Sequence, residues 1–389
     1  MGEWKEYQID EVSEVVGGGT PKTEVSEFWN GEIAWLTPRD LSGYERRFIS
    51  RGQRNITEAG LENSSAKLLP VGTVLLSSRA PIGYLAIADS PVTTNQGFRS
   101  LIPNSKTTSE FLYYLLKNNV DYLVSQGEGT TFGELAGSTL KAMTFSFPQP
   151  DEQRTIASIL SSLDDKIDLL HRQNQTLEAL AESLFRQWFV EEADEGWEEC
   201  SLFEAIEIVG GGTPKTEVAE YWNGNIKWIS AKDITPNHKG FITNTEKKIT
   251  ATGLENSSAK RLPKFSTVIS ARGTVGKYCI LGDEMTFSQS NYGIMPKFRE
   301  CYFFTYLLIA ESVEELKSAA YGTVFDTITT NTFKEHKINI PSELEIKGFE
   351  KSVRPYFQKM LTNSDQIRTL TQLRDTLLPK LMSGEVRVG

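Results

Sequence analysis

The chain has 389 residues, of which 39% are hydrophobic and 24% are charged. This composition predicts a folded protein of two or three domains, and it excludes fibrous and disordered proteins. The net charge of −10 and the pI near 5.1 argue against binding of nucleic acid through bulk positive charge, so any such binding must be local.

The apolar runs give no sign of a membrane segment. None approaches the roughly 18 residues that a bilayer-spanning helix needs. The first five residues also lack the basic start and the apolar stretch of a signal peptide. We therefore expect a cytoplasmic protein that has no membrane partner.

The dominant feature of the sequence is an internal duplication. Val16–Val25 recurs letter for letter as Val209–Val218, and Gly60–Lys67 recurs as Gly253–Lys260 at the same offset. A constant offset predicts two structural units of one kind joined in tandem, and the period is far too long for a solenoid. We expect a pseudo-twofold relation between the two copies, which would suit a target that is itself in two parts.

Short apolar runs separated by Gly, Pro, Asn and Ser predict strands in both copies. The first copy has such runs at residues 33–36, 73–76, 84–87 and 143–147, and the second has them at 267–269 and 278–280. One helix is expected from a cap at Ser109 to about Val124, and another near residues 302–319. Each copy is therefore expected to be a mixed α and β globule.

A different pattern follows Pro148 and again follows Pro341. Apolar residues spaced alternately four and three apart run from Ile156 to Trp188 and from Phe349 to Leu381. This heptad spacing predicts two long helices, each about 60 Å long if unbroken. Since neither helix could expose such a stripe to water by itself, we expect them to pair as an antiparallel coiled coil.

Each heptad stripe contains one asparagine, Asn174 in the first and Asn363 in the second. When the two stripes are matched end to end, these asparagines face one another. They are expected to form a buried amide pair that fixes the register and antiparallel polarity of the helices. The alternative is that each lies in a frayed or solvated part of the seam.

Together these patterns predict an α+β fold with two mixed α/β domains separated by a long antiparallel two-helix coiled coil. The expected domains are residues 1–150 and 193–341, and the expected helical spacers are residues 151–192 and 342–389.

No catalytic or metal-binding pattern stands out. The string Gly-Gly-Gly-Thr-Pro-Lys-Thr is not a phosphate-binding loop, because Pro21 and Pro214 occupy the place of the glycine that must precede Lys-Thr. We interpret it as a glycine-rich turn after a strand. The three histidines and three cysteines lack the spacing of a metal site. We therefore expect no catalysis, metal or cofactor in this chain.

Comparison of the two copies divides the polar residues into those that differ between the copies and those that both copies share. Divergent residues are candidates for base contacts, because Arg, Gln and Asn can bond base edges bidentately. They are Arg39, Arg46, Arg47, Arg51, Gln53 and Arg54 in the first copy, and Lys232, Asn237, His238 and Lys239 in the second. The alternative for this set is a solvated charged loop.

Residues in the shared loops cannot distinguish two different half-sites, so they either support the fold or contact phosphate. The phosphate candidates are Thr20, Lys22, Arg79, Thr130, Thr131, Lys215, Arg272 and Thr323. The alternatives are solvated side chains for the lysines and internal salt bridges for Arg79 and Arg272.

Four blocks together resemble the specificity subunits of Type I restriction-modification systems. They are residues 17–41, which open with the glycine string, residues 75–83, Thr94-Asn95-Gln96-Gly97-Phe98, and Pro148-Gln149-Pro150-Asp151-Glu152-Gln153. The resemblance covers the whole chain, in the order globule, helix, globule, helix.

The resemblance implies a non-catalytic subunit of a larger complex. Each globule would be a target recognition domain that reads one half of a bipartite double-stranded DNA target, and the helices would set the spacing. The helices would also dock two modification subunits, which transfer a methyl group from S-adenosylmethionine to adenine. Two restriction subunits, which are motors and nucleases that need ATP and Mg, would complete the complex. Positive potential from these partners would account for the acidic pI.

The sequence departs from this family in one respect. The opening blocks of the two copies are more alike than an asymmetric target requires. Either the half-sites are related, or specificity resides in the divergent loops after Arg39 and Lys232 and in residues 97–127 against residues 290–320. Two other classes stay open, namely a duplicated protein-binding scaffold without DNA sequence readout and an enzyme with an unrecognised site.

Overall fold

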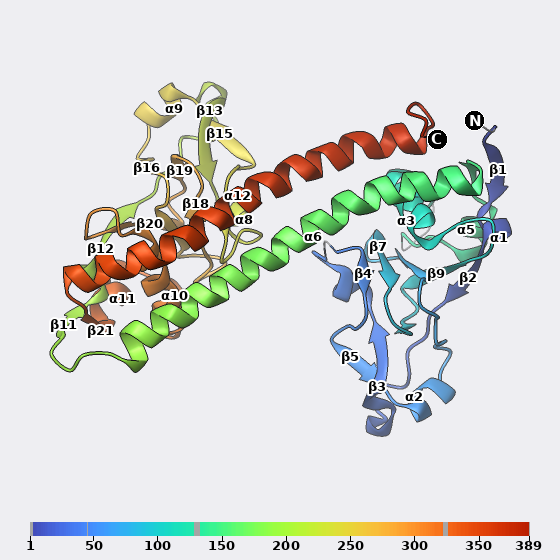
Figure 1. Cartoon of the computed structure of the whole chain (residues 1–389), viewed down its shortest axis with the longest axis horizontal. Coiled ribbons are helices and arrows are strands. Elements are labelled where there is room, and N and C mark those ends of the chain that lie inside the picture. The colour runs from blue at the N-terminus through green and yellow to red at the C-terminus, as the bar shows by residue number, and fades with distance from the viewer. Residues whose placement is uncertain (1–2, 45, 128–132, 322–325, 389) are drawn as a thin grey trace. The chain divides into compact units, whose positions relative to one another are not determined.

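The structure is a computed structural model that describes residues 3–44, 46–127, 133–321 and 326–388. The chain divides into two compact units. The first comprises residues 1–168 and 369–389, and the second comprises residues 169–368. Each unit contains one globular head, which we call head 1 and head 2, and a section of each of two long helices, α6 (Pro150–Arg186) and α12 (Glu343–Met382) (Figure 1).

Head 1 is built on a five-stranded sheet in the order β2-β9-β6-β7-β4. Its strands are β2 (Ser13–Gly17), β4 (Phe48–Ile49), β6 (Val74–Ser78), β7 (Ile82–Ala88) and β9 (Phe98–Pro103), and only the β4–β7 pair is parallel. A smaller sheet has the order β5-β3-β8, formed by β3 (Trp29–Leu36), β5 (Arg54–Ile56) and β8 (Thr93–Thr94). A two-stranded sheet pairs β1 (Lys5–Gln8) with β10 (Thr144–Phe147).

Head 2 repeats this topology. Its five-stranded sheet has the order β12-β20-β17-β18-β14, formed by β12 (Ile206–Gly210), β14 (Phe241–Ile242), β17 (Thr267–Ser270), β18 (Tyr278–Leu281) and β20 (Asn291–Pro296). The smaller sheet has the order β15-β13-β19-β16, formed by β13 (Trp222–Ile229), β15 (Lys247–Ile249), β16 (Arg261–Leu262) and β19 (Met285–Phe287). Strand β11 (Glu198–Ser201) pairs with β21 (Lys337–Ile340). The duplication read from the sequence is therefore a duplication of fold, and the α+β class is confirmed.

Helices pack on both sheets of each head and connect the strands. In head 1 they are α1 (Ile9–Val12), α2 (Glu58–Glu62), α3 (Ser109–Asn118), α4 (Val120–Gly127) and α5 (Gly137–Ala142), with 3₁₀ turns at Ser26–Phe28 and Pro38–Leu41. In head 2 they are α7 (Leu202–Ala205), α8 (Ala231–Ile234), α9 (Ala251–Glu255), α10 (Tyr302–Tyr321) and α11 (Thr330–Glu335), with a 3₁₀ turn at Ala219–Tyr221.

The helix expected from Ser109 to Val124 is interrupted, which corrects the prediction. Helix α3 ends at Asn118 and α4 begins at Val120, because the Asn119 backbone leaves the helical conformation. The Asn119 side chain stabilises this break by donating to the Leu115 carbonyl at 2.7 Å. The N-cap is Thr108 rather than Ser109, since the Thr108 hydroxyl accepts from the Phe111 amide at 3.2 Å.

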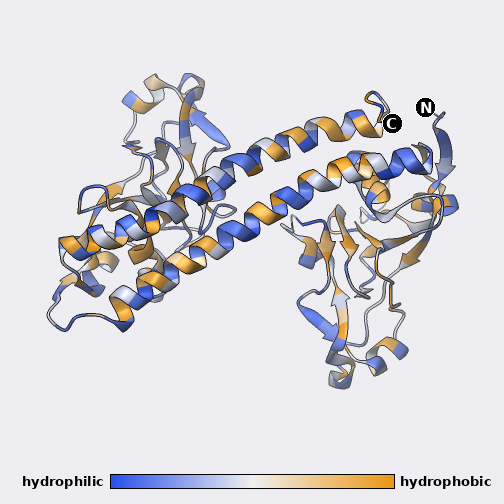
Figure 2. Ribbon diagram, in the orientation of Figure 1, coloured by the Kyte–Doolittle hydropathy of each residue, from blue (hydrophilic) through white to orange (hydrophobic). Residues whose placement is uncertain are grey.

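The two long helices run antiparallel within each unit. In the first unit Asp164 of α6 contacts Arg374 of α12, and Glu152 contacts Arg387 just beyond α12. In the second unit Asn174 contacts Asn363, and the rings of Phe185 and Phe349 lie 5.7 Å apart. Apolar and polar residues alternate along both helices, as the heptad pattern requires (Figure 2).

The end of the first heptad stripe departs from the prediction. After Arg186 the helix widens into a π-helical turn, Gln187–Glu191. Trp188 is partly exposed in this turn, but its ring still contacts Phe349 of α12, with centroids 5.6 Å apart, and Phe185 and Phe189 pack against the same ring.

Each head buries its core partly against the long helices. Ile156, Leu160, Leu378 and Leu381 belong to the core of the first unit. Phe185, Phe349, Val353 and Phe357 belong to the core of the second. Each head is therefore continuous with one end of α6 and one end of α12, rather than being a separate globule.

Candidate DNA interface

The shared glycine string has a structural role that is the same in both heads. The indole of Trp35 donates to the Gly19 carbonyl at 2.9 Å, and the indole of Trp228 donates to the Gly212 carbonyl at the same distance. A Cβ on Gly18 would lie 2.1 Å from the Asn95 carbonyl oxygen, so only glycine allows this approach. The glycines therefore pack a loop against the small sheet, as the turn interpretation proposed.

The second shared block also supports the fold. The Thr57 hydroxyl caps α2 by accepting from the Gly60 amide at 3.1 Å, and Thr250 caps α9 through Gly253 at 3.0 Å. A Cβ on Gly60 would lie 2.4 Å from the Phe28 carbonyl oxygen. The identity of Gly60 and Gly253, which open the two blocks, is explained by this packing.

Four loops of head 1 converge on one surface, which we call the loop face. The Thr20 hydroxyl donates to the side-chain oxygen of Gln96. The neighbouring Gly97 lies against the Pro38 ring, and its carbonyl accepts from the Ser78 amide at 2.7 Å. The carboxylate of Asp40 accepts from the Gln53 amide at 2.8 Å. These contacts connect the segments that carry Thr20, Arg39, Gln53 and Arg79.

Head 2 builds an equivalent loop face from the matching residues. The Thr213 hydroxyl donates to the side-chain oxygen of Gln289, and the Ala271 amide donates to the Ser290 carbonyl at 2.9 Å. The Asp233 carboxylate accepts from the Glu246 amide at 2.8 Å. Lys232 and Arg272 therefore occupy places that correspond to Arg39 and Arg79.

Several candidate cations are exposed on the loop faces and form no ion pair within the described part of the chain. They are Lys22, Arg39 and Arg51 in head 1, and Lys215, Lys232 and Arg272 in head 2. The side chain of Gln53 is exposed as well. Each loop face therefore presents three exposed cations without an internal ion pair in the described ranges, on a chain whose net charge is negative.

Arg54 differs from these cations because an aromatic ring supports it. Its guanidinium carbon lies 3.5 Å from the centroid of the Trp29 ring, and Lys247 lies over Trp222 at 5.6 Å in the equivalent place. Stacking holds the planar guanidinium in a preferred orientation, whereas an ammonium is a point charge. The two heads therefore present different cations at the same position. Arg79 is half-buried and lies 3.9 Å from Glu134, so the salt-bridge alternative is present in the structure.

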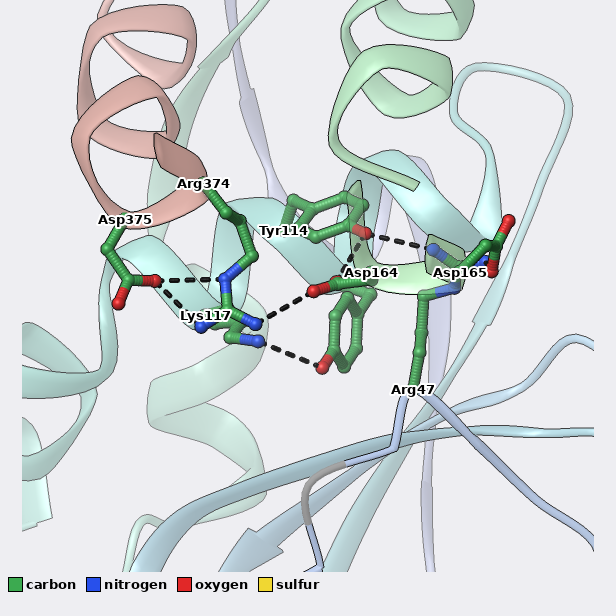
Figure 3. Close-up of polar contacts among 8 residues, drawn as sticks. Arg47, Tyr114, Lys117, Asp164, Asp165, Arg374 and Asp375 are labelled. Carbon is green, nitrogen blue, oxygen red and sulfur yellow. Dashed lines mark hydrogen bonds and ion pairs between the residues drawn. The ribbon is translucent and has the colours of Figure 1, made fainter. Parts of the chain in front are cut away.

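Three candidates form ion pairs with α6, and of these Arg47 is buried whereas Arg46 and Lys239 are exposed. Figure 3 shows Arg47 between Tyr114 and Asp165, with the guanidinium 3.0 Å from the phenol oxygen and 2.7 Å from the carboxylate. Burial would lower the pKa of Arg47, but Tyr114 and Asp165 raise it above its ordinary value. Arg46 pairs with Asp168 at 3.1 Å, and Lys239 pairs with Glu182 at 2.8 Å. These side chains attach the loops to α6, so our proposal for DNA contacts leaves them out.

The Arg47 contacts belong to a larger cluster at the junction between head 1 and the helices (Figure 3). Tyr114 donates to Asp164 at 2.6 Å, and the same carboxylate accepts from Arg374 at 2.8 Å. Burial and the adjacent Asp164 carboxylate raise the pKa of the Tyr114 phenol, which therefore stays protonated as a donor. The cluster joins the head, α3, α6 and α12.

Asn237 and His238 also have internal partners. Asn237 donates to the Asp233 carbonyl at 2.8 Å, and the His238 ring stands edge-on to Tyr278 with centroids 5.0 Å apart. Burial lowers the pKa of His238, which favours the neutral ring at neutral pH. Both residues line a cavity of about 490 Å³ in the second unit, next to Asn174 and Glu178.

The seam asparagines are in contact. The Asn363 amide donates to the Asn174 side-chain oxygen at 2.9 Å, and Asn363 is fully buried. The geometry expected from the heptad register is therefore present, while a role in fixing register and polarity stays a prediction.

Thr130, Thr131 and Thr323 lie outside the described residues. Gln96 and Gln289 are loop-face residues that sequence reasoning missed. The available signal was their occurrence in equivalent loops of both copies, although the Thr contact that orients them becomes visible only in the folded heads.

Within the described ranges, no group of three or more His, Cys, Asp or Glu residues could hold a metal ion. Cys279 and Cys301 are buried and Cys200 is half-buried, all as free thiols. Among the described helices, none is long and apolar enough to span a membrane.

Comparison with known proteins identifies the family. The family model described as the Type I restriction modification DNA specificity domain matches residues 1–179 and again residues 194–351. The chain belongs to this family. The two matches of the specificity domain each cover one head, which agrees with the duplicated topology.

Relatives of this specificity family span nearly the whole chain. The MjaIX Type I restriction enzyme specificity subunit of Methanocaldococcus jannaschii is 35% identical over 99% of this chain and 94% of its own length. The HindI specificity subunit of Haemophilus influenzae is 24% identical over 99% of this chain and 100% of its own. The crystal structure of a Type I restriction-modification system S subunit from M. genitalium has the same fold, with a TM-score of 0.62, 18% identity, and coverage of 97% of this chain and 96% of that one.

Proposed function

We propose that this chain is the DNA specificity subunit of a Type I restriction-modification complex, in which each head reads one half of a bipartite DNA target. Family membership supports this function, and the loop faces support the division of labour. The observation that supports the proposal most directly is that two heads of one topology present equivalent loop faces. The divergent loops on these faces differ in charge. Residues 50–55 of head 1 read SRGQRN, whereas residues 243–248 of head 2 read TNTEKK.

Among the candidates, we assign Arg39, Arg51, Gln53 and Arg54 to base readout in head 1, and Lys232 to the equivalent role in head 2. We assign Lys22, Lys215 and Arg272 to phosphate contacts, because they are exposed cations that occur in both copies. The assignment leaves out cations that form an internal ion pair, since a side chain held by an internal carboxylate must lose that partner before it can bind DNA.

The proposal divides the remaining functions between the long helices of this chain and the partner subunits. The long helices would set the spacing between half-sites and dock two modification subunits, and two restriction subunits would complete the complex. S-adenosylmethionine, ATP and Mg would be bound by those partners, and this chain would be non-catalytic.

The proposed function predicts an adenine methylation pattern that depends on this gene. Methylated adenines would be mapped across the host genome in strains with and without the gene. We expect one bipartite motif to lose methylation when the gene is absent. An unchanged methylation map in a host that expresses the modification subunits would instead favour the protein-binding scaffold.

A loop exchange tests the division between heads. Replacing residues 50–55 with the sequence of residues 243–248 changes the divergent loop but retains Arg46 and Arg47, which attach head 1 to α6. We expect one half of the methylated motif to change and the other half and the spacing to be retained. A change in both halves would contradict independent readout by the two heads.

A further inference from the structure

Gln96 and Gln289 occupy equivalent, exposed positions on the two loop faces. In head 1 the Thr20 hydroxyl donates to the Gln96 side-chain oxygen, and in head 2 the Thr213 hydroxyl donates to the Gln289 side-chain oxygen. The same polar arrangement is therefore built twice, from separate parts of the chain.

Backbone contacts hold each pair of loops together beneath this side-chain contact. The Gly19 amide donates to the Thr94 carbonyl at 2.8 Å, and the Gly212 amide donates to the Phe287 carbonyl at 2.9 Å. The turn that follows Thr94 is further closed by the Gly97 amide, which donates to the Asn95 side chain at 2.9 Å. The position of each glutamine is thus determined by buried glycine packing and not by the glutamine itself.

The threonine contact determines which hydrogen bonds each glutamine can still make. A primary amide has one carbonyl oxygen and two N–H donors. Because the threonine hydroxyl already donates to one lone pair of the oxygen, each exposed glutamine has two N–H donors and one lone pair left, and donation by the NH₂ group is its main remaining capacity. An oriented donor selects an acceptor atom, and the neighbouring exposed lysines, Lys22 and Lys215, favour a ligand of negative charge.

We propose that Gln96 and Gln289 each donate an amide N–H to a DNA acceptor atom that occurs at the same place in both half-sites, an inference that rests on the proposed function. The two glutamines differ in their flanking residues but are oriented by the same threonine contact, so we expect them to recognise the same chemistry, and the acceptor is then a feature common to both halves. It is either a phosphate oxygen or an acceptor on a base that both halves contain, such as a purine N7.

The test uses the full chain assembled with the modification subunits of its host and a duplex that carries the target found by methylation mapping. Gln96→Glu keeps the side-chain length and can still accept from Thr20, but it replaces the donor with a charged acceptor. We expect its affinity for the target to fall about tenfold or more, and that of Gln96→Ala about three- to tenfold. Gln289→Glu and Gln289→Ala should act alike through the other head.

Two further variants separate a DNA contact from a general effect. Gln149 is an exposed glutamine just before α6, and Gln149→Ala should retain wild-type affinity. Thr20→Val should weaken binding through Gln96 alone, so it should add little to Gln96→Ala. Thermal unfolding of each variant establishes that the heads stay folded.

Duplexes with single base changes distinguish the two acceptor sources. A phosphate contact predicts that Gln96→Ala weakens binding to all duplexes by the same factor. A base contact predicts lost discrimination at one position of one half-site. Either result supports the proposal. Folded Gln96→Glu and Gln289→Glu variants that bind as the wild type would overturn it. The proposed function itself fails only if the wild-type complex does not distinguish the target from a scrambled duplex.

Discussion

At the scale of single residues, the duplication separates two reasons for identity between the copies. Trp35 and Trp228 donate to equivalent glycine carbonyls, so their identity is a requirement of packing. Lys22 and Lys215 follow the same glycine turn but are exposed, and packing does not explain their identity. A shared ligand that carries negative charge would explain it.

Lys22→Gln should reduce the salt dependence of DNA binding. Neutralising one phosphate contact removes about one released counterion, so the slope of log affinity against log salt should fall in magnitude by about 0.9. Binding titrations at several salt concentrations measure this slope. The matched control is Lys5→Gln, an exposed lysine on the two-stranded sheet of head 1, which should leave the slope unchanged. Equal slopes for Lys22→Gln and wild type would remove Lys22 from the interface.

Arg374→Met should destabilise the first unit. Arg374 and Asp164 are both largely buried and 2.8 Å apart, so the substitution leaves the Asp164 carboxylate without its cation. Breaking a buried ion pair on one side costs about 3–5 kcal/mol, of which Tyr114 would offset a part through its hydrogen bond to Asp164. Urea unfolding measures the change. Arg154→Met, which removes an exposed pair with Asp151, should cost less than about 1 kcal/mol.

At the scale of elements, α6 and α12 are held by different chemistry in the two units. The first unit uses the Arg374–Asp164 pair and the tyrosine contacts. The second stacks Phe303 of α10 on Phe357 of α12, with ring centroids 4.4 Å apart, and contains the Asn174–Asn363 amide pair. Its polar contacts to α6 are made by Tyr306 to Glu178 and by Lys239 to Glu182. Titration and salt should therefore act differently on the two junctions.

Substitution of the amide pair should reveal coupling between Asn174 and Asn363. Asn363→Leu removes the donor to the Asn174 oxygen and should cost about 1–3 kcal/mol. The double variant, with leucine at both positions, removes the polar groups together and should recover much of that loss. Urea unfolding of the two single variants and the double variant forms a double-mutant cycle. Additive effects, within about 0.5 kcal/mol, would show that the pair makes no specific contribution.

Glu178 should make the second unit less stable as pH rises. Burial raises the pKa of Glu178 to about 7, although the hydrogen bond from Tyr306 at 2.7 Å opposes the rise. The ordinary value is 4.5, so the folded state binds the proton more tightly than the unfolded state. The resulting stability is fully present below about pH 4.5 and is lost as pH rises through about 7.

The comparison of wild type with Glu178→Gln isolates this effect. The difference in unfolding free energy should change by up to about 3 kcal/mol between pH 4.5 and 7.5, with the wild type losing stability at the higher pH. Urea unfolding at a series of pH values measures it. Glu350 is a second buried acid whose pKa burial raises to about 7. Because both proteins contain Glu350, its effect cancels in the difference. The control Glu314→Gln, at an exposed position on α10, should show the same pH dependence of the unfolding free energy as the wild type.

The sequence predicted the elements that have a clear period and missed an interruption that the period does not reveal. The heptads located α6 and α12 and placed Asn174 opposite Asn363. The break at Asn119 was not predicted, because the apolar period continues through it.

The candidate site shows the same division. Exposed cations such as Lys22 and Arg39 were recognisable from their loops. Arg47 was not recognisable as an internal residue, because its partner Asp165 lies 118 positions away on α6. A single sequence contains no signal for such a pair.

At the scale of the whole molecule, the proposed spacing role of the helices can be tested by lengthening them. One heptad added to both α6 and α12 preserves the seam and adds about 10 Å of helix, or about three base pairs of DNA. Methylation mapping should report a longer spacer with both half-sites unchanged. An insertion of seven residues in α6 alone breaks the pairing and serves as the control. Altered half-sites with an unchanged spacer would contradict the spacing role.

One end of α6 and one end of α12 complete the core of each head, so the choice of fusion point matters when chimeras are built. A head transplanted by cutting at Pro148 or Pro341 would leave behind Ile156, Leu160, Leu378 and Leu381, or their counterparts in the second unit, and would arrive with an open hydrophobic surface. Fusion points placed inside the helices, near residues 168 and 369, keep each donor's interior whole. Chimeric chains should therefore be joined within α6 and α12, where the main requirement is that the heptad patterns of the two donors match.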